Sequence, residues 1–219
     1  MEPDFWLERW RQNQIGFHRE GVNPRLAAYF EALRLPAGAH VFVPLCGKSH
    51  DLHWLAAQDY AVSGVELSPL AIHALFSELG LTPRPGIAPP LQLHQHGLLR
   101  VFEGDFFSLT PEHLGAVDAV FDRAALVALT PAQRLLYAQH LLRLAPRARV
   151  LLVTLDYPQE AMPGPPFAVS PEEVQRLFGR HWDICALCSE DVLASEPHLA
   201  ARGLPRLVET VSLLTPRHV

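Results

Sequence analysis

The feature that most constrains the fold is an alternation of short apolar segments with helix-like segments. The apolar segments predict buried strands at 40–45, 60–67, 98–105, 117–122 and 149–155. Helical patterns lie between several of them, at 49–58, 69–79 and 131–144. Alternation of this kind is typical of a parallel sheet with helices on both faces, so the sequence predicts an α/β protein.

Proline marks the predicted helix starts. At five places a common helix-capping residue precedes a proline at the first helical position: Asn23-Pro24, Ser68-Pro69, Thr110-Pro111, Thr130-Pro131 and Ser170-Pro171. Reciprocal caps are expected between Thr130 and Gln133 and between Ser170 and Glu173. Most of the other prolines fall in two segments that we expect to be loops, 82–90 and 157–167.

The pattern differs at the two ends of the chain. The first 35 residues predict two helices before the first strand. Residues 182–191 and 207–215 predict two further strands with no clear helix between them, which suits antiparallel pairing. A length of 219 residues is enough for one sizeable core, so we expect a single domain over 1–219.

Composition narrows the function classes. Net charge is −5, which disfavours nucleic-acid and anionic-membrane partners. No apolar stretch approaches the roughly 20 residues of a membrane span, and an N-terminus with early acids and tryptophans does not resemble a signal peptide. Three cysteines are too few for a disulfide framework. We therefore expect a soluble, cytoplasmic protein, and a monomer.

Three residues at predicted strand ends describe an adenosine site. Gly47 permits a tight turn after the first strand. Glu66 ends the second strand, where an acid can accept hydrogen bonds from both ribose hydroxyls. Asp105 ends the third, where a carboxylate can accept from an adenine amino group. Glu66 is expected to face solvent and to contribute little to packing; the alternative interpretation is an ordinary surface acid.

The adenosine compound is expected to carry no phosphate. Gly47-Lys48-Ser49 resembles the end of a P-loop, but Phe42 stands where that motif needs a glycine. One glycine is also too few for a dinucleotide turn. S-adenosylmethionine, an adenosine joined to a charged amino acid, fits these conditions.

Other reactive side chains favour structural interpretations. His94 and His96 lie in an expected exposed hairpin without metal-ligand partners nearby, so no metal site is predicted. Cys185 and Cys188 are expected to face opposite ways along a strand, and Cys46 has no base near it in sequence. Trp6 and Trp10 could be core residues, and Arg123 a surface arginine.

Several segments together resemble the thiopurine S-methyltransferase family, particularly its bacterial members. They are FWLERWRQNQIGFH (5–18), VFVPLCGKSHDLHWLA (41–56), GVELS (64–68), FDRAALVAL (121–129) and PGPPF (163–167). The resemblance implies a class I S-adenosylmethionine-dependent methyltransferase fold, which is Rossmann-like. It has a mostly parallel seven-stranded sheet with the last strand antiparallel, helices on both faces, and an N-terminal helical cap, here residues 1–35.

The resemblance also implies site residues. Cofactor contacts fall on Trp10, Leu45, Glu66 and Arg123, and Trp6 lies near them. Further contacts fall on Asp105 and Phe106 after the third strand, and the turn at Gly47 completes the set. Phe17 matches a position between cofactor and substrate, and Pro166 and Phe167 lie in the segment near the acceptor. In 192–206, Arg202 and His198 are weaker candidates.

The implied activity is methyl transfer to the sulfur of small aromatic or heterocyclic thiols such as thiopurines. Such an in-line displacement needs mainly alignment of donor and acceptor, so no residue is predicted as a catalytic base, and Arg123 is a candidate for orienting the cofactor. Two alternatives stay open. One is a related methyltransferase acting on halide, aliphatic thiol, selenium or tellurium compounds; the other is a non-catalytic sensor of adenosine ligands.

Overall fold

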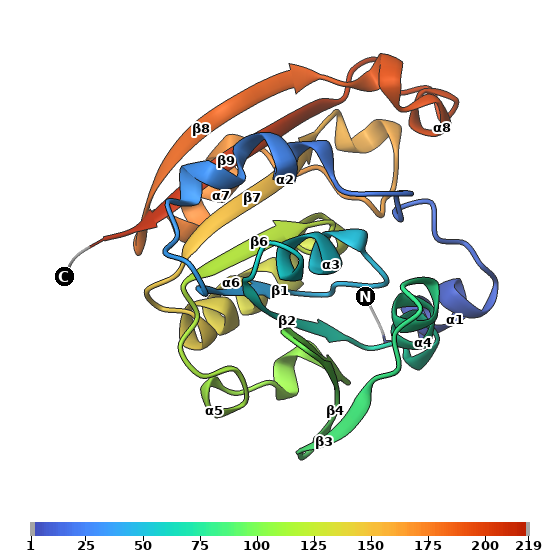
Figure 1. Ribbon diagram of the computed structural model, residues 1–219. Coiled ribbons are helices and arrows are strands. Elements are labelled where there is room, and N and C mark those ends of the chain that lie inside the picture. Colours follow the sequence, from blue (N-terminus) through green and yellow to red (C-terminus); the bar gives the residue numbers. More distant parts are fainter. Residues whose placement is uncertain (1–2, 218–219) are drawn as a thin grey trace.

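The structure, a computed structural model, describes residues 3–217 and has one nine-stranded sheet at its centre (Figure 1). The strand order is β3-β4-β5-β2-β1-β6-β7-β9-β8. The strands are β1 His40–Val43, β2 Ala61–Glu66, β3 Arg84–Ala88, β4 Leu91–His96, β5 Leu99–Glu103, β6 Ala119–Arg123, β7 Arg149–Asp156, β8 Trp182–Asp191 and β9 Val208–Pro216. Residues 1–2 and 218–219 of the expected domain, and with them the start of the expected 1–35 cap, lie outside the described residues.

The seven strands predicted from the sequence are consecutive neighbours in this sheet, from β5 to the edge strand β8. β5, β2, β1, β6 and β7 are parallel neighbours in that order. β9 then pairs antiparallel with β7, and β8 antiparallel with β9. The α/β class, the mostly parallel sheet and the antiparallel last strand are therefore confirmed.

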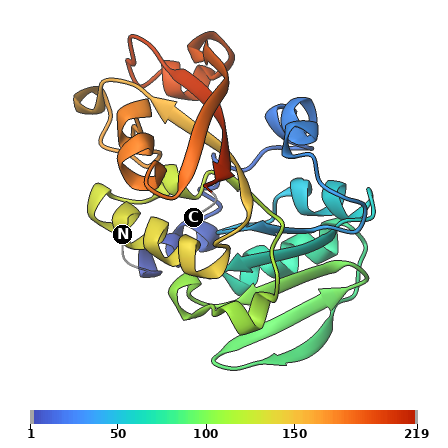
Figure 2. The same ribbon diagram turned by 90° about the vertical axis from the view of Figure 1, so that its left-hand side faces the viewer.

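The prediction of a loop at 82–90 was wrong, and the sheet has two strands more than expected. β3 and β4 form an antiparallel hairpin on β5, at the opposite end of the sheet from β8 and β9 (Figure 2). Proline is tolerated in β3 because β3 is an edge strand. Gly86 is needed there, since a Cβ at this position would lie 2.6 Å from a Leu93 side-chain carbon.

Helices cover both faces of the sheet. They are α1 Pro3–Arg11, α2 Pro24–Tyr29, α3 His50–Ala56, α4 Pro69–Glu78, α5 Pro111–Leu114, α6 Pro131–Leu144, α7 Pro171–Phe178 and α8 Pro197–Ala200. Side chains of α2, α3 and α4 share one buried cluster with the sheet, and those of α5, α6 and α7 share another. Within residues 3–217, no helix has the length and apolar character needed to cross a membrane.

The helix starts follow the capping pattern of the sequence. Each of the five marked prolines lies in the first turn of a helix, and the Thr130–Gln133 reciprocal cap is present. Of the second reciprocal cap, between Ser170 and Glu173, only one of the two hydrogen bonds forms. Ser170 accepts from the Glu173 backbone N–H, but the Glu173 carboxylate instead pairs with the buried Arg134 at 2.7 Å.

Two further expectations about the C-terminal region need correction. The segment between β8 and β9 was expected to lack a helix, yet it contains the short helix α8 and a 3-10 turn at Leu193–Ser195. A bulge between Ala186 and Cys188 also breaks the simple alternation along β8, since Cys185 pairs with Leu213 and Cys188 with Val211. The argument that the two cysteines face opposite ways therefore fails.

Candidate cofactor and acceptor site

A cavity of about 650 Å³ lies at the carboxyl ends of β1, β2, β5, β6 and β7, where α/β sheets bind ligands. The predicted cofactor residues all line it: Trp6, Trp10, Leu45, Gly47, Glu66, Asp105, Phe106 and Arg123. Of the predicted acceptor residues, Phe17 and Pro166 line it as well. Phe167, the third predicted acceptor residue, is not among the described residues that line the cavity. Its ring lies 5.9 Å from the Arg134 guanidinium carbon.

Glu66 joins two neighbouring loops at the centre of the cavity wall. Its Oε2 accepts from the Gly47 backbone N–H at 2.9 Å and its Oε1 from the Ser68 N–H at 2.8 Å. The side chain is buried, and this desolvation raises the pKa of the carboxyl, against the lowering effect of those N–H groups. The expectation of a solvent-facing acid was wrong. Each oxygen still has acceptor capacity for a ligand hydroxyl.

The turn that carries Gly47 disfavours a side chain. Gly47 has φ +55°, and a Cβ there would lie 3.3 Å from the Trp10 indole. The preceding Cys46 donates its N–H to the Val65 carbonyl at 3.0 Å, and burial raises the pKa of its thiol. A protonated, enclosed thiol is a poor nucleophile, which agrees with the structural interpretation of Cys46.

Aromatic side chains close the cavity from the N-terminal side. The Phe17 ring meets Trp6 and Trp10 edge to face, each at 5.7 Å between centroids. Arg123 reaches under them and donates from Nη1 to the Phe17 carbonyl at 2.7 Å. Trp6, Trp10 and Arg123 are therefore wall residues of the cavity rather than core or surface residues.

Arg123 is a cation without a carboxylate partner. Burial is the main cause that lowers the pKa of its guanidinium. Across residues 3–217, no Asp or Glu oxygen lies within 4.0 Å of it. Its charge is thus available to a ligand in the cavity.

Asp105 and Phe106 form the wall after β5. Asp105 is exposed, and its Oδ1 accepts from the Phe107 N–H at 3.0 Å, which caps a short 3-10 turn. Phe106 is buried and stacks on Tyr137 at 4.9 Å. Tyr137 in turn donates its hydroxyl to Asp122 Oδ2 at 2.6 Å. Burial raises the pKa of Asp122 from 3.8 to about 6.

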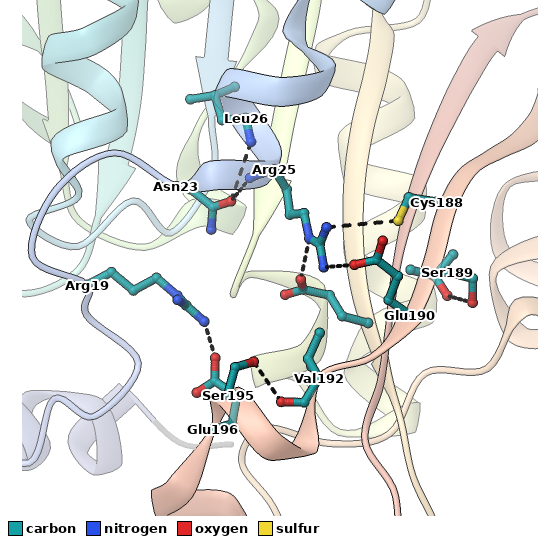
Figure 3. A network of polar contacts seen from close by, with 12 residues as sticks. Arg19, Asn23, Arg25, Leu26, Cys188, Ser189, Glu190, Val192, Ser195 and Glu196 are labelled. Atoms are coloured by element: carbon teal, nitrogen blue, oxygen red, sulfur yellow. Dashed lines mark hydrogen bonds and ion pairs between the residues drawn. The ribbon is translucent and has the colours of Figure 1, made fainter.

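A second group of wall residues was missed by the sequence analysis. Ion pairs join the segment 19–25 to β8, to β9 and to the segment between these two strands (Figure 3). Arg19 pairs with Glu196, and Arg25 pairs with Glu190 at 2.8 Å and Glu209 at 2.7 Å. Arg19, Glu196 and Glu209 line the cavity, as do the weaker candidates His198 and Arg202.

These residues fit an adenosine compound without phosphates. The buried carboxylate at the end of β2 offers acceptors to paired hydroxyls, and the aromatic wall offers flat apolar faces. The turn after β1 contributes the single glycine, whose N–H is already bound to Glu66. An anion at this turn would meet the Glu66 carboxylate, which disfavours a pyrophosphate.

Solved structures with the same fold define the class. One is an S-adenosylmethionine-dependent methyltransferase from Thiobacillus denitrificans in complex with S-adenosylhomocysteine. It has a TM-score of 0.64 and 16% identity, with 96% of this chain and 98% of that chain covered. A methyltransferase from Anabaena variabilis has a TM-score of 0.63 and 13% identity, with 98% and 95% covered. The chain therefore has the fold of the class I S-adenosylmethionine-dependent methyltransferases.

Sequence relatives narrow the class to a family. The family model for thiopurine S-methyltransferase matches residues 1–217. The thiopurine S-methyltransferase of Nitrosospira multiformis is 50% identical over 218 residues, with 99% of each chain covered. That of Pseudomonas fluorescens strain SBW25 is 48% identical, with 99% of this chain and all of the relative covered. The chain belongs to the thiopurine S-methyltransferase family.

Proposed function

We propose that this enzyme transfers the methyl group of S-adenosylmethionine to the sulfur of small aromatic or heterocyclic thiols such as thiopurines. The observation that carries the proposal is one cavity that joins the strand-end residues Glu66 and Asp105 to the aromatic side chains of Trp6, Trp10 and Phe17. Membership of the family supports the acceptor class.

The cofactor half of the cavity is the part built on Gly47 and Glu66. Glu66 would accept from the ribose hydroxyls with the lone pairs that the backbone N–H groups leave free. Asp105 would accept from the adenine amino group through its second oxygen. Leu45, Phe106 and the two tryptophans would supply the apolar walls. S-adenosylmethionine, when bound, supplies an electrophilic methyl group on a sulfonium.

The acceptor half would lie between Phe17 and Pro166. Apolar walls there would strip water from a thiolate, and a fixed geometry would bring its sulfur in line with the methyl carbon. Arg123 would favour the thiolate electrostatically and orient the bound groups. Because aromatic thiols are acidic, no residue is assigned as an indispensable base. We place the enzyme, as a monomer, in the cytoplasm, where its three free cysteines would remain reduced.

The test is transfer of radiolabelled methyl to a panel of aromatic thiols, aliphatic thiols, halides and selenium or tellurium compounds. Preferred turnover of aromatic and heterocyclic thiols is the expected result. Preference for another group in the panel would replace the proposed acceptor, and absence of all transfer despite tight cofactor binding would favour a sensor. Dialysis against a chelator should leave turnover intact, since displacement at the methyl carbon needs no Lewis acid.

Cofactor identity has a separate test. S-adenosylmethionine at 100 times its dissociation constant should stabilise the fold by about 2.7 kcal/mol. For a domain of this size the melting temperature should rise by roughly 5–10 °C. A rise with ATP or NAD but none with S-adenosylmethionine would overturn the assignment.

A further inference from the structure

Two histidines and a glutamate from three separate segments meet beside the cofactor cavity. His18 follows Phe17 in the segment 12–22, His50 is the first residue of α3, and Glu78 is the last residue of α4. One ligand atom from each residue lies within 4.8 Å of the other two. The two imidazole rings are 5.7 Å apart and inclined by 32°. Together with Asn13 and Glu20 they line an open hollow next to the cavity.

The two imidazoles lack the partners that such groups usually have. Throughout residues 3–217, neither ring makes a hydrogen bond to protein, although both side chains are half-buried. Glu78 uses one oxygen, Oε1, to pair with Lys48 at 2.6 Å. By contrast, His94 is paired with Glu103, and His96 with the Thr82 carbonyl. Unused metal-ligand atoms of His18, His50 and Glu78 are therefore gathered at one place.

We propose that His18, His50 and Glu78 form a binding site for a divalent transition ion, with Zn²⁺ as the ion that fits best. Two imidazole nitrogens and one carboxylate oxygen are a donor set that Zn²⁺ takes, with a fourth position left to water. Zn–N bonds of ~2.0–2.1 Å place neighbouring ligand atoms about 3.3 Å apart. Rotation of the half-exposed side chains closes the remaining gap, with the second oxygen of Glu78 facing the ion and the first still on Lys48.

The site would act as a clamp on the cavity wall rather than in the chemistry. The Phe17 carbonyl accepts from Arg123 one residue before His18, and Gly47 lies three residues before His50. An ion held by His18, His50 and Glu78 would therefore join three parts of the chain. They are the segment that carries Phe17, the start of α3 and the end of α4. Neither His50 nor Glu78 is a lining residue of the cofactor cavity, so turnover is expected to continue without the ion.

The test is calorimetric titration of the reduced, full-length protein with Zn²⁺ at slightly alkaline pH. The Cys185→Ser background removes an exposed competing thiol. We expect one tight Zn²⁺ site in the parent. The Zn²⁺ affinity should be at least tenfold lower in His50→Gln and in Glu78→Gln. His53→Gln is the matched control, because His53 is an exposed histidine on the same helix and should bind as the parent does. Co²⁺ should show visible bands of imidazole-bound metal in the parent and not in His50→Gln.

Equal Zn²⁺ affinity in the parent and in both site variants would overturn the proposal, as would the absence of any tight site in the parent. Metal-free melting temperature and S-adenosylhomocysteine affinity serve as controls for folding. Both should be unchanged in His50→Gln. Should His50→Gln unfold, Glu78→Gln decides the question alone, because Glu78 is exposed at the end of its helix. The affinity should also fall as the pH is lowered, since protonated imidazoles do not bind metal.

Discussion

The two ends of the cavity are built by different means. At the end proposed for the cofactor, Glu66 contacts backbone groups only 19 and 2 residues away in sequence, beside strand ends that the parallel sheet aligns. At the opposite end, which we propose for the acceptor, Arg19 and Arg25 contact acids 165 to 184 residues away. The first end is fixed by the register of the sheet. The second depends on charged side chains that join distant segments, so it can vary without loss of the fold.

The largest effect is expected from Glu66→Ala. Two charge-assisted bonds to the ribose are worth roughly 3 kcal/mol together, so cofactor affinity should fall by about 100-fold. The acceptor KM should change far less, because the two ends are separate. The Gly47 and Ser68 N–H groups also lose their acceptor, at about 1–3 kcal/mol each, so the melting temperature should fall too. Calorimetry and thermal unfolding measure both.

Glu66→Gln is the control for this variant. It keeps the shape and one oxygen but turns an amide donor toward a backbone N–H, so its affinity and stability should lie between those of the parent and the alanine variant. Unchanged cofactor affinity in Glu66→Ala would remove the ribose role and leave a purely structural acid.

The next largest expected effect is on the free energy of unfolding. Folding raises the pKa of Asp122 from 3.8 to about 6, so the folded state binds this proton more tightly than the unfolded state. The free energy of unfolding therefore falls as the pH rises from about 4 to about 6, by about 3 kcal/mol in total, and is level above that range. Asp122→Asn should remove the share of this dependence that Asp122 contributes in denaturant titrations, and the exposed Asp59→Asn should keep it. A slope as steep in Asp122→Asn as in the parent contradicts the assignment.

Arg123→Met tests the boundary between the two ends. The variant loses the charge in the cavity and the bond to the Phe17 carbonyl, worth about 1.5–3 kcal/mol. We expect kcat/KM to fall by roughly 10- to 100-fold, with Arg123→Lys in between. A loss confined to cofactor affinity would assign Arg123 to the cofactor end alone.

The smallest effect is expected at the acceptor end from Arg25→Met. Two carboxylates lose their partner, one of them the mostly buried Glu209 on the cavity wall, at a cost of about 1–2 kcal/mol in stability. The acceptor KM should rise severalfold while cofactor affinity stays as it was. Arg84→Met, at an exposed position in β3, is the matched control and should change neither. Weaker cofactor binding in Arg25→Met would show that the ends are coupled.

The sequence predicted that the strand-end residues proposed for the cofactor lie together, because this part of the geometry follows from local rules. Strand ends of a parallel sheet meet at one edge, which brings Gly47, Glu66 and Asp105 together from their positions alone. Helix starts followed from capping residues before prolines. The buried state of Glu66 was missed because burial depends on the loops that fold over it, and these carry no local signal.

The acceptor end and the metal-ligand cluster could not be predicted in the same way. The pair Arg19 and Glu196, and the group of His18, His50 and Glu78, depend on how loops of the folded chain approach one another. Nothing in the spacing of these residues distinguishes them from solvated surface groups. Strand β3 was missed for another reason: its proline and glycine are typical of loops, and only an edge strand accommodates them.

The edges of the sheet bear on how this protein behaves at high concentration. An exposed edge strand offers unpaired backbone groups to other chains and so promotes aggregation. One edge here is the short β3, in which Pro85 has no N–H to offer, and the other is β8, which carries a bulge and ends in the acids Glu190 and Asp191. Proline, bulge and charge all hinder strand addition. Replacing Pro85 with valine would thus remove one hindrance to the addition of a strand from a second chain at the β3 edge.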